Sequence, residues 1–201
     1  MRVISTNIAQ PRTIIWNKKE VTTGIYKEPT NTGLYLQESK VQGDEISDRI
    51  HHGGVFKACY IFSIEQYPYW QHHYPSLNWN YGMFGENLTL AEFDEREVYH
   101  GDIYKVGEAL VEITQYREPC YKLGYKFGSQ KILKQFISHG FAGSYLRVLK
   151  EGRVENGDTF QLIERPQKSL SVHSLFKLAY EKEKDSELLR IASESHPFLK
   201  T

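Results

Sequence analysis

The chain has 201 residues, of which 40% are hydrophobic, and at about 100 to 200 residues per domain this length favours one domain with one buried core. Lys and Arg total 25, as do Asp and Glu, and the zero formal net charge argues against a large basic surface for direct nucleic-acid binding. No apolar run forms a signal-peptide core or approaches the roughly 20 residues of a spanning helix, so we expect a cytoplasmic protein without membrane association.

The distribution of aromatic residues and glycines predicts a mainly β domain. The chain has 14 Tyr and 10 Phe, many of them in short β-prone segments that glycines interrupt at irregular intervals. This pattern is typical of a β-barrel or a sandwich. Because the pattern turns helical shortly after Pro166, we assign residues 1–166 to the β domain and residues 167–201 to a short C-terminal helical extension.

The stretch from Gly43 to Lys57 is the first candidate site. Its histidines, His51 and His52, precede the pair Gly53-Gly54, and such a pair lets backbone N–H groups approach a ligand, so phosphate binding is one interpretation. A hydrogen-bonded turn with surface histidines is the other. Adjacent residues of a strand point to opposite faces, so at most one of these histidines is expected in one site.

Three further features precede residue 90. Cys59 lies in an apolar run and is predicted to be an inert core residue. A helix is predicted from Ser63 to about Tyr74, with Pro68 kinking it or delaying its start. In the segment from Phe84 to Leu88, an amide and a carboxylate beside a glycine predict either contacts to a heterocycle or, preferably, a capped local turn.

The clearest hairpin joins residues 102–106 to residues 109–115 through Gly107-Glu108, because a glycine in the first turn position suits a type II′ turn. A second hairpin is predicted around Glu151-Gly152. The pattern Val-x-x-Gly-Asp occurs at residues 98–102 and again at residues 154–158, which indicates either a repeated unit or common turn chemistry.

Cys120 follows the best predicted strand, in a position where a loop presents side chains to a pocket. The nearby Arg117 and Lys122 favour its thiolate form, which is the form that binds metals or attacks as a nucleophile. A buried, inert cysteine is the alternative. With two cysteines the chain has no disulfide framework, and no P-loop, dinucleotide fingerprint or H-E-x-x-H zinc motif occurs.

The remaining helices are predicted near the C-terminus. Residues 129–139 have a helical apolar period followed by Gly140, which is typical of a helix end. From Ser169 onward, apolar residues on both sides of a charged run predict a terminal pair of helices. Both are too short to be stable alone, so we expect them to pack on the β domain or on a second subunit in a homodimer.

Several motifs occur in a fixed order along the middle of the chain: His52-Gly53-Gly54, Lys57-Ala58, Phe84-Gly85-Glu86-Asn87-Leu88, Gly101-Asp102, Arg117-x-Pro119-Cys120-Tyr121-Lys122 and Gly143-x-Tyr145-x-Arg147-Val148-Leu149-x-x-Gly152-x-Val154-x-x-Gly157-Asp158. Together they resemble the MOSC domain family, in the order and spacing of its YiiM-type bacterial branch. The resemblance covers about Val41 to Arg165, and the combination is far more specific than any single motif in it.

The resemblance implies a MOSC-like β-barrel that binds the molybdenum cofactor (Mo-molybdopterin), with Cys120 as catalytic residue and metal ligand. A soft thiolate is a reasonable ligand for such a centre. The basic residues that the resemblance makes candidates for the cofactor phosphate are Lys57, Arg117, Lys122 and Arg147. His52 and Asn87 match motif positions of the family and are expected to line the same pocket.

The resemblance also implies an activity, the reductive detoxification of small N-hydroxylated compounds, including hydroxylamino base analogues such as 6-hydroxylaminopurine. An iron–sulfur cluster, which could carry electrons, usually takes about four cysteines, and the chain has two. Electrons are therefore expected from a separate reductase. Two alternatives stay open. One is a non-catalytic carrier that holds cofactor or sulfur on Cys120, and the other is an interaction protein with an inactive site.

Overall fold

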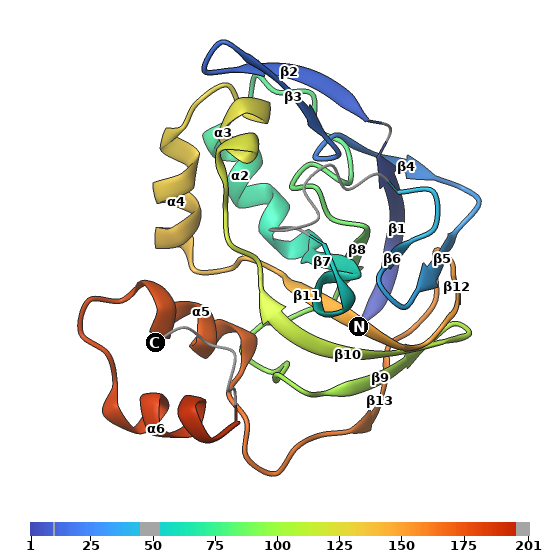
Figure 1. Cartoon of the computed structure of the whole chain (residues 1–201), viewed down its shortest axis with the longest axis vertical. Helices are drawn as coiled ribbons and strands as arrows, with labels where there is room; N and C mark the ends of the chain where they lie inside the picture. Colours follow the sequence, from blue (N-terminus) through green and yellow to red (C-terminus); the bar gives the residue numbers. More distant parts are fainter. Residues whose placement is uncertain (10, 45–52, 196–201) are drawn as a thin grey trace.

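The computed structural model describes residues 1–9, 11–44 and 53–195 (Figure 1). Its main sheet contains the strands β1 (Arg2–Ala9), β4 (Lys27–Thr30), β7 (Cys59–Ser63), β8 (Leu88–Ala91), β9 (Ile103–Val106), β10 (Ala109–Tyr116), β11 (Ser144–Lys150) and β13 (Gln161–Glu164). The order across the sheet is β13-β9-β10-β11-β7-β8-β1-β4. Neighbours are antiparallel except for β7 and β8, which are parallel. The sheet curls into a half-barrel, which confirms the predicted mainly β, MOSC-like class.

Two smaller sheets complete the β structure of the described chain. One has the order β12-β5-β6, from Gly152–Val154, Leu34–Gln37 and Lys40–Val41. The other is the hairpin of β2 (Arg12–Trp16) and β3 (Lys19–Thr23). The predicted hairpin around Glu151-Gly152 is therefore wrong. β11 ends at Lys150 and β12 begins at Gly152, and β12 pairs with β5 instead of with β11.

The predicted hairpin at Gly107-Glu108 is confirmed. Ala109 pairs with Val106 across the turn, and Gly107 has a φ of 53°, a left-handed value that glycine adopts without strain. The two copies of the Val-x-x-Gly-Asp motif form the same kind of turn at two places in the chain. Asp102 accepts a hydrogen bond from the N–H of Tyr99, and Asp158 accepts the equivalent bond from Glu155.

The described helices are η1 (Val55–Lys57), η2 (Ile64–Gln66), α2 (Tyr67–His73), α3 (Tyr121–Lys126), α4 (Lys131–His139), α5 (Val172–Tyr180) and α6 (Ser186–Ser195). The helix predicted from Ser63 begins as the 3-10 turn η2, and the α-helix starts only at the residue before Pro68, as expected for a proline at this position. Helix α4 is confirmed, with Gly140 ending it at a φ of 83°. The terminal pair is confirmed as α5 and α6.

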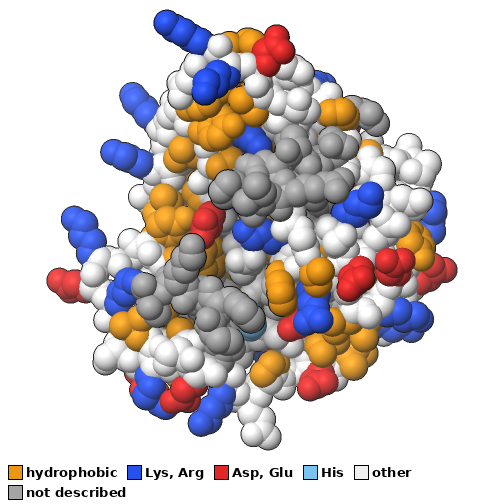
Figure 2. Space-filling view, in the orientation of Figure 1, with side chains coloured by type: hydrophobic (Ala, Val, Ile, Leu, Met, Phe, Trp, Pro, Cys, Tyr) orange, Lys and Arg blue, Asp and Glu red, His pale blue; other side chains and the backbone are white. Residues whose placement is uncertain are grey.

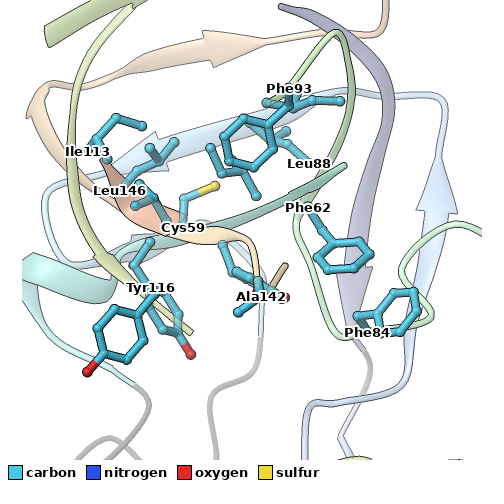
Figure 3. Packing of buried hydrophobic residues seen from close by; sticks show 14 of the residues in the cluster. Cys59, Phe62, Phe84, Leu88, Phe93, Ile113, Tyr116, Ala142 and Leu146 are labelled. Atoms are coloured by element: carbon cyan, nitrogen blue, oxygen red, sulfur yellow. Dashed lines mark hydrogen bonds between the residues drawn. The ribbon is translucent and has the colours of Figure 1, made fainter. Parts of the chain in front are cut away.

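The core lies between the curled sheet and the helices α2 and α4. The rings of Phe62 and Phe84 are 4.2 Å apart, and the rings of Trp70 and Phe136 are 5.6 Å apart. Cys59 belongs to the same buried cluster, beside Leu146 in Figure 3, and is 1% exposed, which confirms that it is a core residue. Burial raises the pKa of the Cys59 thiol.

Helix α5 packs against the end of β10. The ring of Phe176 on α5 lies 5.4 Å from that of Tyr116 at the end of β10. The pair α5–α6 lies at the opposite end of the molecule from the β2–β3 hairpin (Figure 1). On the face shown in Figure 2, the described Lys and Arg side chains are scattered among acidic and apolar ones instead of gathering into one large basic surface. None of the described helices has the length and apolar character needed to cross a membrane.

Candidate active site

Cys120 lies between the end of β10 and the start of α3. It is the residue before the helix, with extended backbone angles (φ −127°, ψ 168°), and its carbonyl accepts a hydrogen bond of 2.9 Å from the N–H of Leu123. Its side chain is half-buried, whereas that of Cys59 is fully buried. Of the two thiols, Cys120 is therefore the one that a ligand can reach.

Arg117, three residues before Cys120, is buried, with 5% of its surface exposed. Its guanidinium lies over the ring of Tyr60 at 5.2 Å and the ring of Phe136 at 5.8 Å. Its Nη1 atom is buried and has no hydrogen-bond partner among the residues that the structure describes. An unsatisfied nitrogen of a buried cation is costly, so this atom marks a place for an acceptor that the described chain does not supply.

The charges around Arg117 link it to Cys120. Burial opposes the charged guanidinium, but Tyr60, Tyr145 and Cys120 together hold the pKa of Arg117 above its ordinary value. Burial also raises the pKa of the Tyr145 hydroxyl, which the adjacent Arg117 opposes. The guanidinium is thus a fixed positive charge close to Cys120.

Two of the other predicted cations, Lys57 and Lys122, belong to segments next to Arg117 and Cys120. Lys57 lies with its Nζ 5.7 Å from the centre of the Tyr145 ring, and that ring packs 5.4 Å from Tyr60. Lys122, in the first turn of α3, is 6% exposed. Lys57 and Arg117 therefore share one pair of tyrosine rings, and Lys122 is held two residues beyond Cys120.

Arg147 lies farther along β11. It is two residues beyond Tyr145, so its side chain leaves the strand on the same face. Its Nη1 is 3.6 Å from Glu112 Oε2, and its guanidinium lies 5.3 Å from the centre of the Phe56 ring. Arg147 thus lies beside η1, the short helix that contains Lys57.

Asn87 has a structural place. Its side chain accepts a hydrogen bond from the N–H of Tyr60 (3.1 Å) and donates to Asp44 Oδ2 (2.9 Å), and Asp44 forms a buried ion pair with Lys27. The amide therefore fixes the backbone of Tyr60, one of the rings next to Arg117. His52 lies outside the described residues, so its predicted place in the pocket stays a prediction.

The segment before Asn87 is a capped turn. The buried carboxylate of Glu86 accepts hydrogen bonds from the N–H groups of Gly82 and Phe84 and from the hydroxyl of Tyr67. These contacts use the carboxylate within the protein. They confirm the capping interpretation of this motif over the heterocycle contact.

The sequence pattern of the MOSC domain matches residues 48–161, more than half of the chain and the whole span that carries Arg117 and Cys120. The chain belongs to the MOSC domain family. MOSC domains are associated with the molybdenum cofactor.

Relatives of this MOSC chain place it in the YiiM-type branch. It is similar to the solved structure of YiiM from Geobacillus stearothermophilus, with a TM-score of 0.79 and 32% identity over 98% of this chain and 91% of that chain. It is 36% identical to the Bacillus subtilis protein YflK over 96% of this chain and 87% of the relative. It is also 36% identical to a protein of Gibberella moniliformis named "Reductase", over 76% of this chain but only 28% of the relative.

Two groups of residues near the MOSC site were missed by sequence reasoning. The first is the set of rings around Arg117, namely Tyr60, Tyr145 and Phe136. The second is Trp16 at the end of β2, whose ring stacks on Tyr121 at 4.8 Å, next to Cys120. The alternation of side chains along a strand can be read from the sequence and could have indicated that Tyr60 and Tyr145 each point to a definite face. The sequence does not show that β7 pairs with β11, which is what brings the two rings together.

Glu95 is linked to Arg117 through the backbone of Gly143. Its buried carboxyl accepts hydrogen bonds from the N–H groups of Ala142 (3.0 Å) and Gly143 (2.8 Å), and the carbonyl of Gly143 accepts one from the N–H of Arg117 (3.3 Å). Burial raises the pKa of Glu95 to about 7, although both N–H donors pull it down. The carboxyl thus positions the strand segment against which Arg117 lies.

Proposed function

We propose that this protein is a molybdenum cofactor-dependent reductase of N-hydroxylated compounds, such as hydroxylamino base analogues, with Cys120 as the protein ligand to the metal. The observation that carries the proposal is the buried guanidinium of Arg117, with an unsatisfied Nη1 beside the accessible Cys120. A buried cation with one nitrogen that finds no acceptor among the described residues, next to a thiol, matches the needs of an anionic, metal-bearing cofactor.

The donor set fits the cofactor chemically. Cys120 supplies a soft sulfur ligand, and Arg117 supplies a planar cation that can bind a phosphate or a pterin oxygen. Lys57, Lys122 and Arg147 add positive charge around the phosphate. His52 and Asn87 are proposed to contribute to the walls of the pocket, Asn87 by holding Tyr60 in place.

When bound, the cofactor supplies two-electron reduction of the N–O bond. In the net reaction, one N-hydroxylated amine, two electrons and two protons give one amine and one water, with the N–O bond broken. The residues of this chain hold the cofactor and orient the substrate. Arg117 is a permanent cation, so it can bind an anionic group of the cofactor without itself giving up a proton.

We propose that the electrons come from a separate reductase. The chain has two cysteines, one of them buried in the core, and an iron–sulfur cluster usually takes about four. The MOSC part spans 28% of the fungal relative named "Reductase", which leaves most of that protein for other work, and electron supply is one candidate. A cytoplasmic location fits the two free thiols, which a reducing compartment preserves.

The test compares wild type, Cys120→Ala and the matched control Cys59→Ala, all produced in a host that makes the cofactor. Molybdenum content and reduction of 6-hydroxylaminopurine with a chemical electron donor are measured. We expect near-stoichiometric metal and turnover in the wild type and the control, and neither in Cys120→Ala. Stable metal without turnover favours a carrier of cofactor or sulfur, and metal retained by Cys120→Ala contradicts the proposal.

A further inference from the structure

A cavity lies at the other end of helix α3 from Cys120. Its volume is about 250 Å³, and its lining includes Arg12, Tyr26, Lys27 and Lys126. None of the six predicted site residues that the structure describes lines it. Lys126 is the last residue of α3 and Cys120 precedes the first, so the two ends of the helix are separated by about 9 Å at 1.5 Å per residue.

Cations gather around one ring in this cavity. The guanidinium of Arg12 lies 4.9 Å from the centre of the Tyr26 ring, and Lys126 Nζ lies 5.5 Å from the same centre. Met83 and Tyr26 supply an apolar wall for a flat molecule. An aromatic wall flanked by two cations suits a ring that carries negative charge.

The charge of the cavity favours an anion. Lys27 is buried in an ion pair with Asp44, so its charge is balanced inside the protein. Glu28 lies 3.6 Å from Arg12, but both side chains are more than half exposed, and such exposed pairs are weak, at about 0 to 1 kcal/mol. An incoming anion can therefore compete with Glu28 for Arg12. The charged form of Lys126 is opposed by burial, Arg117 and Lys27 and favoured by the carboxylates of Glu86 and Glu28, and among the described residues its Nζ forms no ion pair with a carboxylate.

Lys126 is tied down by two backbone carbonyls. Its Nζ donates to the carbonyl oxygens of Ile25 (3.1 Å) and Gly82 (2.9 Å). An ammonium has three N–H donors, so one more is left for an acceptor in the cavity, counting the hydrogen bonds of the described residues. A fixed donor loses little side-chain entropy when it binds a ligand.

We propose that this cavity binds a small aromatic or heteroaromatic ring that carries one oxyanion group, a carboxylate or a phosphate, between Arg12 and Lys126. The cavity volume fits a ligand of this small size, since it is below the roughly 300 to 1,000 Å³ of pockets that bind drug-sized molecules. The proposal does not depend on the function assigned to Cys120.

Isothermal titration of the purified full chain tests the proposal, with phenyl phosphate and benzoate as probes and with benzamide and inorganic phosphate as controls for charge and ring. We expect one site for the ring anions, and at least about tenfold weaker binding of both controls, since a charged hydrogen bond is worth this much. The tighter of the two ring anions identifies the oxyanion.

The variant Arg12→Gln should weaken the better probe by about tenfold. The matched control Arg190→Gln removes another exposed arginine that is paired with glutamate, on α6 at the opposite end of the molecule, and should leave binding unchanged. Cys120→Ala should also leave it unchanged, which separates this site from the proposed active site. Absence of saturable binding, or binding that ignores Arg12→Gln or disappears in Cys120→Ala, overturns the proposal.

A second readout avoids mutating Lys126, whose two carbonyl contacts support the fold. Burial lowers the pKa of Lys126 to about 8, so near this pH part of the population is neutral. Binding of an anion should draw a proton onto the amine, so the observed enthalpy at about pH 8 should vary with the ionisation enthalpy of the buffer. Equal enthalpies in two such buffers would contradict a contact between the anion and Lys126.

Discussion

The guanidinium of Arg117 lies 5.2 Å above the ring of Tyr60, whose own backbone N–H is held by Asn87 Oδ1. The cation is thus fixed by a ring that the main sheet fixes in turn. The position of the Arg117 guanidinium therefore depends on β7, the strand that carries Tyr60, as well as on the loop that contains Arg117.

Replacing Arg117 by Lys should weaken retention of the molybdenum cofactor by about tenfold or more, because lysine keeps the charge but lacks the planar, bidentate donor set. The measurement is metal content before and after gel filtration. Arg96→Lys is the control, since the Arg96 guanidinium also lies over a ring, that of Phe141, at 5.8 Å, but on an exposed side chain. Equal retention in both variants would show that the buried guanidinium does not hold the cofactor.

Replacing Gly143 by Ala should destabilise the fold by more than about 2 kcal/mol, since a left-handed backbone costs about 1 to 2 kcal/mol for a side chain and a clash adds to it. Gly143 has a φ of 74°, and a Cβ there would come 2.3 Å from the carbonyl oxygen of Ile61. Gly128 has a similar φ of 70° with open space around it, so Gly128→Ala is the matched control. Urea denaturation measures both, and similar losses would mean that the close approach at Gly143 is relieved at no cost.

Glu95 should make the protein less stable as pH rises. Its pKa in the folded state, about 7, is above the ordinary 4.5, so the folded state holds the proton more tightly than the unfolded state does. Its stability contribution is therefore largest below about pH 4.5 and is lost as pH rises through about 7, by up to about 3 kcal/mol at about 1.4 kcal/mol per unit.

The difference between wild type and Glu95→Gln isolates this effect. The free energy of unfolding of each protein is measured at about pH 5 and about pH 8. Relative to wild type, Glu95→Gln should be more stable at about pH 8 than at about pH 5, by about 1 kcal/mol or more. Glu183→Gln, at an exposed position, is the control and should show no such change. A pH-independent difference between wild type and Glu95→Gln would argue against a proton on Glu95.

Replacing Trp16 by Leu should loosen the β2–β3 hairpin, because the stack on Tyr121 is worth about 0.5 to 1.5 kcal/mol beyond area burial. Amide hydrogen exchange of Arg12–Trp16 and Lys19–Thr23 should speed up by about threefold to tenfold, while β10 and β11 stay unchanged. Ile15→Ala, at a neighbouring side chain that is 56% exposed, serves as the control. Unchanged exchange in Trp16→Leu would show that the stack does not hold the hairpin.

The sequence predicts local features of this protein better than distant ones. The hairpin at Gly107-Glu108 depends on a two-residue turn and is confirmed. Arg117 and Cys120 are three positions apart, so the sequence alone predicts that they lie close together. The hairpin at Glu151-Gly152 was wrong because a turn signal does not say which strand the chain will pair with, and β12 pairs with Leu34–Gln37.

The same limit applies to the site. Tyr60 and Tyr145 are 85 positions apart in the printed sequence and meet only because β7 pairs with β11 in one particular register. Trp16 and Tyr121 meet through the placement of a separate hairpin. Asn87 matched a family motif, but its use as a structural hydrogen-bonding group is visible only once Asp44 and Tyr60 have been located.

The position of β11 has a consequence for the time at which the site forms. This strand, Ser144–Lys150, lies between β10 and β7, and it brings the segment of Arg117 and Cys120 together with that of Lys57. Synthesis proceeds from the N-terminus at about 5 to 20 residues per second, so both outer segments emerge seconds before the strand that joins them. A nascent chain thus carries the Cys120 thiol and the cations near it unassembled until β11 has emerged and paired with both of its neighbours.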